Sequence, residues 1–263
     1  MNSRSRFVSS EPLSPERQNE LNEAYTSGAS LKELSQKYNI DLALLPSHFQ
    51  SPKLVVFDMD STLIKAEVID ELAVEAGIGE KVKHITERAM QGELNFDESL
   101  KARVALLQGL SESALQKVYE RIFLNPGVEE CLKTLHKHGI KTAIASGGFL
   151  YFARLFAARL RMDFVFANEL EILHGKLSGK IHGDILNAQK KADILNQLTK
   201  QLHLNSSQVV AVGDGANDLP MLRAAGLGVA FHAKEKVQNE ASALINFGTM
   251  ETLIDFLGIS REG

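Results

Sequence analysis

Short uninterrupted apolar runs alternate along most of this chain with longer stretches whose apolar residues repeat at helical spacing. These runs lack the alternation of half-exposed strands and are typical of strands buried on both faces of a parallel sheet. The strand candidates are residues 54–57, 141–145, 164–166, 208–212, 227–230 and 243–245. Because helical stretches separate them, the pattern predicts an α/β fold with a doubly wound parallel sheet.

One long stretch, residues 67–123, contains no convincing strand pattern. Its apolar residues repeat at helical spacing, with glycines at the breaks. We therefore expect about four helices inserted after the first strand, dividing the α/β core into residues 51–66 and 124–263. A helical insertion that leaves the sheet beside a strand end is well placed to act as a cap over a site there.

Two other segments depart from the α/β pattern. Residues 171–180 predict a hairpin that turns at His174 and Gly175. Residues 1–50 are polar and predict a short helical N-terminal appendage without a buried strand. Within this appendage, residues 27–40 have the small-residue turn and apolar spacing of a helix-turn-helix, but the segment is too short and too little basic to favour DNA binding.

Composition and charge narrow the functional classes. The 263 residues are 44% hydrophobic with a formal net charge of −4, so bulk electrostatics favours neither nucleic acid nor a membrane as partner. Cys131 is the only cysteine, which excludes an internal disulfide and is compatible with a reducing compartment. No apolar run reaches membrane-spanning length and the N-terminus lacks a secretory apolar core. We expect a cytoplasmic protein, and base rates alone favour a homodimer.

The first strand candidate ends in two carboxylates, Asp58 and Asp60. Ligands of open α/β sheets collect at the carboxyl ends of the strands, so acids placed there face a ligand. The same pair can also be explained as a turn that caps a helix beginning at Ser61 and Thr62. Two such close anions repel each other unless a cation or proton lies between them, and hard oxygen ligands favour magnesium over zinc.

Two further features fall where a site at this edge needs them. Ser146, Gly147 and Gly148 follow the second main strand, where a hydroxyl and glycine N–H groups can bind phosphate oxygens, although a plain strand-to-helix turn explains them equally well. Lys190 and Lys191 stand at the head of a predicted helix, where a lysine can supply positive charge to a phosphoryl group. Their positions in the sequence barely distinguish them from each other or from solvated surface lysines.

The loop after the fourth strand supplies two acids, Asp214 and Asp218, and the amide of Asn217. This glycine-rich loop is neither a Walker loop nor a dinucleotide-binding fingerprint, because the required lysine and third glycine are missing. Its acids are sufficient to complete an oxygen-ligand magnesium site with Asp58.

Together these elements resemble the haloacid dehalogenase superfamily of phosphatases. The motifs are Asp58-Met59-Asp60-Ser61-Thr62, then Ser146-Gly147, then a lysine, then Gly213-Asp214-Gly215-Ala216-Asn217-Asp218. Within that superfamily the chain is similar to the phosphoserine phosphatases at Glu67, Arg103 and residues 86–96, 145–149 and 167–170. The resemblance covers about residues 53–258 and implies a HAD-like Rossmannoid core with a helical cap.

The resemblance implies a Mg²⁺-dependent hydrolysis of O-phosphoserine, a small-molecule phosphomonoester, to serine and phosphate in serine biosynthesis. Asp58 is then the nucleophile that forms an aspartyl-phosphate, and Asp60 first protonates the departing serine oxygen and later deprotonates water. The implied metal ligands are Asp58, the Asp60 main-chain carbonyl and Asp214, with Asp218 supporting them.

For the phosphoryl oxygens, the resemblance implies binding by Ser146, the Gly147 N–H and Lys191, which it selects over Lys190, with Asn217 helping to fix the lysine.

The same resemblance assigns the cap a role in specificity. It implies that Glu67 binds the substrate ammonium, that Arg103 binds its carboxylate, and that Met90 and Phe96 close over the site. Packing of the cap helices is the alternative explanation for Met90 and Phe96, and a solvated helix face is the alternative for Glu67 and Arg103.

Two other functional hypotheses differ in class. One is a phosphatase or phosphotransferase of the same fold acting on another small phosphomonoester, such as phosphohomoserine. The other is a non-catalytic binding module, associated with DNA through residues 27–40, against which the intact set of acids and lysine argues. Some relatives carry a full-sized N-terminal α/β regulatory domain, whereas a short segment precedes the first strand here, so regulation by a bound amino acid is not implied.

Overall fold

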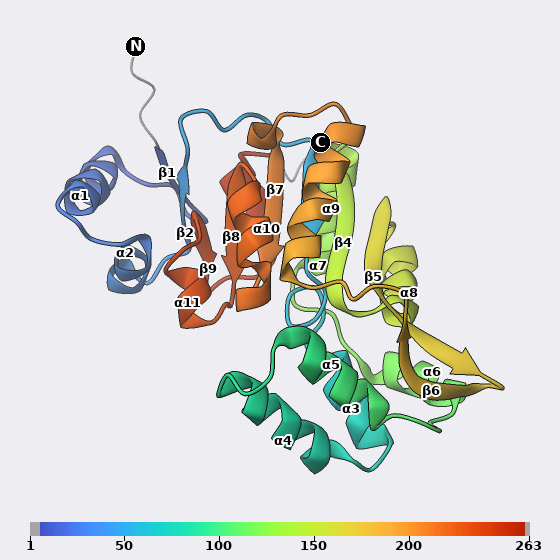
Figure 1. The fold of residues 1–263 in the computed structure, drawn as a ribbon. Coiled ribbons are helices and arrows are strands. Elements are labelled where there is room, and N and C mark those ends of the chain that lie inside the picture. The colour runs from blue at the N-terminus through green and yellow to red at the C-terminus, as the bar shows by residue number, and fades with distance from the viewer. Residues whose placement is uncertain (1–5, 261–263) are drawn as a thin grey trace.

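The computed structural model describes residues 6–260, with the side chain of Met90 excepted, and contains one mixed nine-stranded sheet (Figure 1). The strands run in the spatial order β1-β2-β9-β8-β7-β3-β4-β5-β6. Their bounds are β1 Arg6–Ser9, β2 Leu42–Leu45, β3 Leu54–Phe57, β4 Lys141–Phe149, β5 Phe164–Leu173, β6 Lys176–His182, β7 Val209–Gly213, β8 Leu227–Phe231 and β9 Ala243–Ile245. All neighbouring pairs from β9 to β5 are parallel, which confirms the predicted parallel core.

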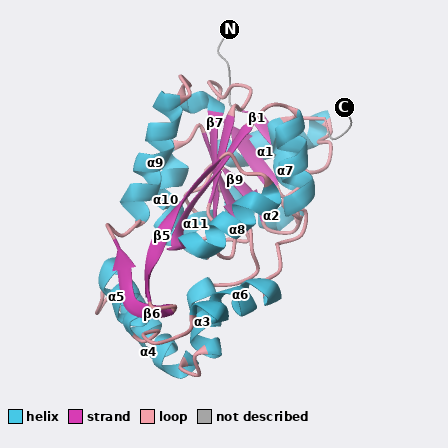
Figure 2. Ribbon diagram, turned by 90° about the vertical axis from the view of Figure 1, so that its right-hand side faces the viewer, coloured by secondary structure: helices cyan, strands magenta, loops and turns pink. Residues whose placement is uncertain are grey.

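Helices cover both faces of this sheet because its central strands are apolar on both sides. On β3, Val55 and Phe57 pack into one hydrophobic cluster while Leu54 and Val56 pack into the other, and all four are fully buried. Burying such a side chain stabilises the fold by about 1.5–3 kcal/mol. Figure 2 shows α7 (Val128–Lys137) and α9 (Ala188–Gln201) on opposite sides of the sheet, as a doubly wound fold requires.

The other core helices are α8 Leu150–Leu160, α10 Leu219–Ala224, α11 Glu235–Gln238 and α12 Thr252–Leu257. Within residues 6–260, no helix combines the length and the apolar content that a membrane span requires.

The N-terminal segment corrects one prediction, because it is not purely helical. It contains α1 (Pro15–Thr26) and α2 (Leu31–Tyr38), but β1 and β2 flank them and extend the sheet, with β2 antiparallel to β9 and β1 antiparallel to β2. The run Leu42–Leu45 is only four residues long, and it becomes a strand through pairing with β9 rather than through its own pattern. The buried Asp41 carboxylate fixes this segment to the core by accepting hydrogen bonds from the successive backbone N–H groups of residues 246–248 at 2.7–2.9 Å.

The predicted insertion contains the expected four helices, α3 Val68–Glu75, α4 Gly79–Met90, α5 Phe96–Ala105 and α6 Glu112–Arg121. Both ribbon views place them beyond one end of the sheet. The two chain crossings lie side by side, since Lys65 N donates to Phe123 O and Asn125 N donates to Leu63 O, each at 2.9 Å.

The predicted hairpin is confirmed as β5 and β6, with His174 and Gly175 both at positive φ in the turn, as a tight primed turn requires. The hairpin also joins the insertion, which its sequence position did not suggest. Gly109 N donates to Leu177 O and Leu177 N donates to Leu110 O, each at 2.8 Å. A third backbone hydrogen bond joins Glu112 N to Gly175 O at 2.9 Å.

Candidate active site

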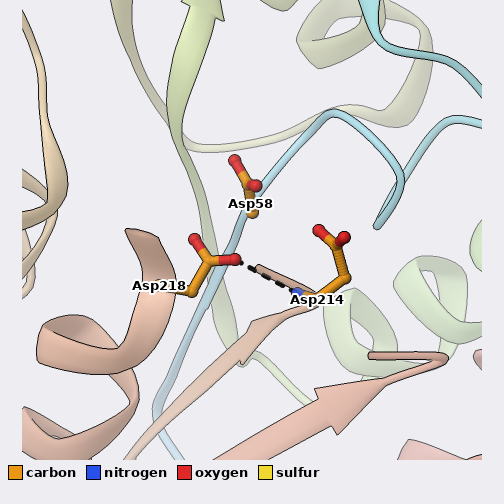
Figure 3. A group of neighbouring side chains, drawn as sticks. All are labelled: Asp58, Asp214 and Asp218. Carbon is orange, nitrogen blue, oxygen red and sulfur yellow. Dashed lines mark hydrogen bonds between the residues drawn. The ribbon is translucent and has the colours of Figure 1, made fainter. Parts of the chain in front are cut away.

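The central strands β3, β4 and β7 are parallel neighbours, so their carboxyl ends meet at one edge of the sheet. Asp58 follows β3, Asp214 follows β7, and Ser146 lies where β4 loses its regular register with β5. Ligand atoms of Asp58, Asp214 and Asp218 all lie within 4.8 Å of one another (Figure 3). The structure therefore brings together the acids that the sequence predicts at separate strand ends.

Backbone donors hold Asp218 in place. Its Oδ2 accepts from the Asp214 and Gly215 N–H groups at 3.1 and 3.0 Å, the first of which is drawn in Figure 3. Its Oδ1 accepts from Lys191 Nζ at 2.7 Å, and the same ammonium lies 2.7 Å from Asp58 Oδ1. One lysine thus joins the acid of β3 to the acids of the β7 loop.

The geometry distinguishes the two lysines that the sequence left ambiguous. Lys191 is completely buried, whereas Lys190 forms an ion pair with the exposed Asp184 at 2.8 Å. On α9, Leu195 and Leu198 are buried, and they stand four and seven positions after Lys191. This i, i+4, i+7 spacing was the sequence signal that Lys191 lies on the buried face of its helix.

The buried carboxylates carry more negative charge than Lys191 balances. Burial, reinforced by Asp218, raises the pKa of Asp58 to about 8, and burial with Asp218 raises the pKa of Asp214 to about 7. Burial also raises the pKa of Asp60 well above its usual value, with added repulsion from Glu67 and Asp58.

Lys191 shows the opposite balance. Burial alone lowers its pKa, but Asp218 and Asp58 more than offset this and raise it.

This donor set fits a hard divalent cation. Three carboxylates converge from two loops, oxygen is the only donor type that they offer, and within the described residues the buried Asp60 Oδ1 has no hydrogen-bond partner. Unpaired buried carboxylate oxygens are costly unless a cation or proton balances them. A metal such as magnesium bound among them would offset the burial and the mutual repulsion that raise these pKa values.

The glycines after Ser146 permit close approach to these acids. A Cβ atom on Gly148 would lie 2.9 Å from Asp60 Oδ2, and one on Gly147 would lie 3.1 Å from the Phe96 ring. The Gly148 N–H donates to Ser146 Oγ at 2.9 Å. Phe96 of α5 therefore lies directly over the glycine loop, which places the insertion against the sheet edge.

A cavity of about 590 Å³ lies between the strand ends and the insertion. The predicted site residues that line it are Asp58, Asp60, Glu67, Phe96, Arg103, Ser146, Gly147, Asp214 and Asn217. A larger cavity, about 820 Å³, lies between α7 and α8, but residues of the amino end of β4 line it and it is remote from these acids. The smaller cavity is the candidate active site because the buried charges converge there.

Glu67 and Arg103 enter the cavity from the insertion. Glu67 Oε1 accepts from Ser61 Oγ at 2.7 Å, and Arg103 Nε donates to Ser99 O at 3.3 Å. Burial lowers the pKa of Arg103 against the opposing effects of Asp70 and Glu67. Among the described side chains, none forms an ion pair with Arg103 within 4.0 Å, so its guanidinium remains available to an anion.

Two predictions need qualification. Met90 is the last residue of α4 and its side chain lies outside the described part of the chain. Within residues 6–260, Lys191 is held by Asp58 and Asp218, and no hydrogen bond joins it to Asn217.

The cavity is also lined by polar residues for which the sequence suggested no role. They are Asp70, Ser99, Lys234 and Thr86, the last of which the sequence marks only as part of the segment 86–96. Asp70 lies one helical turn after Glu67, and Ser99 one turn before Arg103, so helical spacing could have found these two.

Comparison with known proteins agrees with this arrangement. Residues 52–226 match the family model for haloacid dehalogenase-like hydrolases. The chain is 50% identical over 212 residues to phosphoserine phosphatase of Haemophilus influenzae, covering 79% of this chain and 68% of that protein. It is 44% identical over 234 residues to phosphoserine phosphatase of Archaeoglobus fulgidus, covering 88% of this chain and 68% of that protein.

Structural comparison leads to the same family. The crystal structure of a probable phosphoserine phosphatase from Vibrio cholerae is similar to this chain with a TM-score of 0.81 and 38% sequence identity. The similarity covers 97% of this chain and 86% of that chain. From the matched model, the relatives and the shared fold, the chain belongs to the haloacid dehalogenase-like hydrolase family.

Proposed function

We propose that this chain is a Mg²⁺-dependent phosphatase that hydrolyses O-phosphoserine to serine and phosphate. One observation carries the proposal: Asp58, which forms an ion pair with the buried Lys191, lines the same cavity as Glu67 and Arg103 of the insertion, and Asp218 holds Lys191 from behind the cavity wall. The first group suits an anionic phosphoryl group, and the second suits an amino acid. The similarity to phosphoserine phosphatases supports the same substrate.

In the first step an Asp58 carboxylate oxygen bonds to phosphorus as the bond from phosphorus to the serine oxygen breaks. Asp60 donates its proton to the departing oxygen, and burial, which raises the pKa of this carboxyl, favours the protonated form that the step requires. In the second step Asp60 takes a proton from water, whose oxygen bonds to phosphorus and releases Asp58 and inorganic phosphate. Atoms and charges balance over the two steps, and both acids return to their starting states.

The metal ligands in this proposal are Asp58, the main-chain carbonyl of Asp60 and Asp214, with Asp218 supporting them. Mg²⁺ supplies positive charge that keeps Asp58 ionised next to an anionic substrate. Ser146, the Gly147 N–H and Lys191 bind the phosphoryl oxygens, and Lys191 supplies a positive charge next to Asp58.

The insertion, residues 67–123, acts as the cap. Glu67 binds the substrate ammonium and Arg103 binds its carboxylate. Phe96 excludes water above Gly147, and the part that the sequence analysis gives Met90 stays a prediction. The cytoplasmic location and the homodimer expected from the sequence stay predictions.

The test is phosphate release from O-phospho-L-serine, with and without Mg²⁺, by the wild type and by Asp58→Asn. We expect Mg²⁺-dependent release that the substitution abolishes. If the wild type ignores phosphoserine but cleaves p-nitrophenyl phosphate through Asp58, the chemistry stands and the substrate assignment is wrong. Equal turnover of phosphohomoserine would favour the broader phosphomonoesterase instead, and no release from any phosphomonoester would contradict the proposal.

A further inference from the structure

Asn168 is a buried amide on β5 that forms three hydrogen bonds to two backbone segments. It is 2% exposed. Its Nδ2 donates to Gly147 O at 2.8 Å and to Leu186 O at 3.4 Å, and its Oδ1 accepts from Leu186 N at 2.7 Å. An asparagine amide has two N–H donors and one carbonyl, so both hydrogens and the oxygen are engaged.

The first of these segments is the glycine loop. Strands β4 and β5 pair regularly up to Ala145, and the next pair in the ladder is Phe149 with Asn168. Residues 146–148 lie in this irregular stretch, so Gly147 O has no regular ladder partner. The Asn168 side chain supplies that partner and fixes the peptide plane between Gly147 and Gly148.

The second segment leads into the helix that carries Lys191. Leu186 immediately precedes Asn187, whose side chain accepts from Lys190 N at the start of α9 and whose carbonyl accepts from Lys191 N at 3.0 Å. Fixing both polar groups of Leu186 therefore fixes the beginning of α9, and with it the origin of the Lys191 side chain.

We infer that Asn168 is a positioning residue that sets the separation between the Ser146–Gly147 donors and the Lys191 ammonium, and so shapes the site for the phosphoryl oxygens. The Asn168 amide is buried and its N–H groups are bonded to the Gly147 and Leu186 carbonyls, so it acts through Gly147 and α9 rather than by contact with substrate. The inference rests on the proposed function, because it assumes that Ser146, the Gly147 N–H and Lys191 bind the phosphoryl oxygens.

The test compares Asn168→Asp and Asn168→Leu with Thr252→Val. Aspartate keeps the shape and can accept from Leu186 N, but its oxygen faces the Gly147 and Leu186 carbonyls and repels them; leucine removes every hydrogen bond. Thr252→Val is the control, because it removes a buried hydrogen bond to Asp41 at 3.3 Å, remote from the site. Binding of inorganic phosphate in saturating Mg²⁺ is measured by calorimetry, and inhibition constants of phosphate and L-serine are measured with p-nitrophenyl phosphate as substrate.

Both Asn168 variants should bind phosphate at least tenfold more weakly and lose kcat/KM by a similar factor, while the inhibition constant of L-serine stays within twofold. Thr252→Val should change neither constant, although it lowers the melting temperature. Unchanged phosphate affinity in a folded Asn168 variant would overturn the inference, and so would equal weakening of phosphate and L-serine, which indicates general loosening. Failure of the wild type on phosphoserine would reject the proposed substrate while leaving this phosphate measurement decisive.

If neither Asn168 variant folds, amide hydrogen exchange of the wild type decides. Phosphate should slow exchange in residues 146–149 and 183–190 together, because one side chain joins them. Protection confined to one of the two segments would overturn the inference.

Discussion

Replacing the buried Lys191 with methionine removes the charge and keeps a side chain of similar length. Asp58 and Asp218 each lose an ammonium at 2.7 Å, and both carboxylates stay buried. Breaking a buried ion pair by removing one partner costs about 3–5 kcal/mol, because an uncompensated charge remains. In a chain of this size 1 kcal/mol corresponds to about 2–4 °C, so metal-free Lys191→Met should melt about 6–20 °C below the wild type.

The adjacent lysine provides a matched control. Lys190→Met makes the same chemical change in an exposed pair with Asp184, which contributes little to stability because solvent screens it. Adding Asp218→Asn to Lys191→Met should recover part of the loss, because it removes the uncompensated charge at Asp218, whereas Asp58, whose pKa is already raised to about 8, takes up a proton. Melting is followed by circular dichroism in EDTA at pH 7.5. A Lys191→Met protein that melts together with Lys190→Met would refute the electrostatic reasoning.

Three more predictions concern the cavity and its charges. Arg103→Leu should lower kcat/KM for phosphoserine about 10- to 150-fold, because a hydrogen bond to a charged group is worth about 1.5–3 kcal/mol. Hydrolysis of phosphoethanolamine, which lacks the carboxylate, should be unaffected. Equal losses with both substrates would contradict this role of Arg103. Gly147→Ala should lower activity by pressing on Phe96, and Phe96→Leu should restore part of it in a double-mutant cycle; no recovery would argue against that contact. Metal-free protein should lose stability as pH rises through about 7 to 8, since the folded state holds protons on Asp58 and Asp214 that the unfolded chain has released. Urea midpoints at pH 6 and 8.5 check this, and equal midpoints in EDTA would contradict it.

The central architecture was predictable because apolar runs and helical periodicity are local signals. The strand before Asp58 is buried on both faces, as its uninterrupted apolar run predicts. The parallel sheet then brings Asp214 to the same edge as Asp58. The strand Leu42–Leu45 was missed because its burial depends on β9, which is about two hundred residues away in sequence.

Roles that depend on side-chain partners were harder to predict. In the sequence, Asn168 is only one residue of the segment 167–170, which is similar to phosphoserine phosphatases. Its role depends on three hydrogen bonds to Gly147 and Leu186, which only the structure shows. Lys234 reaches the cavity from the loop after β8, and no spacing rule connects it to the acids. Long-range hydrogen bonds and loop paths are set by the tertiary fold, so a single sequence does not carry them locally.

The hairpin of β5 and β6 has a mechanical consequence for access to the cavity. It ties the loop at residues 109–112 to the core through three backbone hydrogen bonds, each worth about 1 kcal/mol. A rigid swing of the whole insertion about its two crossings would break all three. A displacement of α4 breaks none of them, and α4 contributes Thr86 and Ala89 to the cavity wall. The path to the buried acids that costs the least free energy to open is therefore on the α4 side. Helix α5 stays in place beside it.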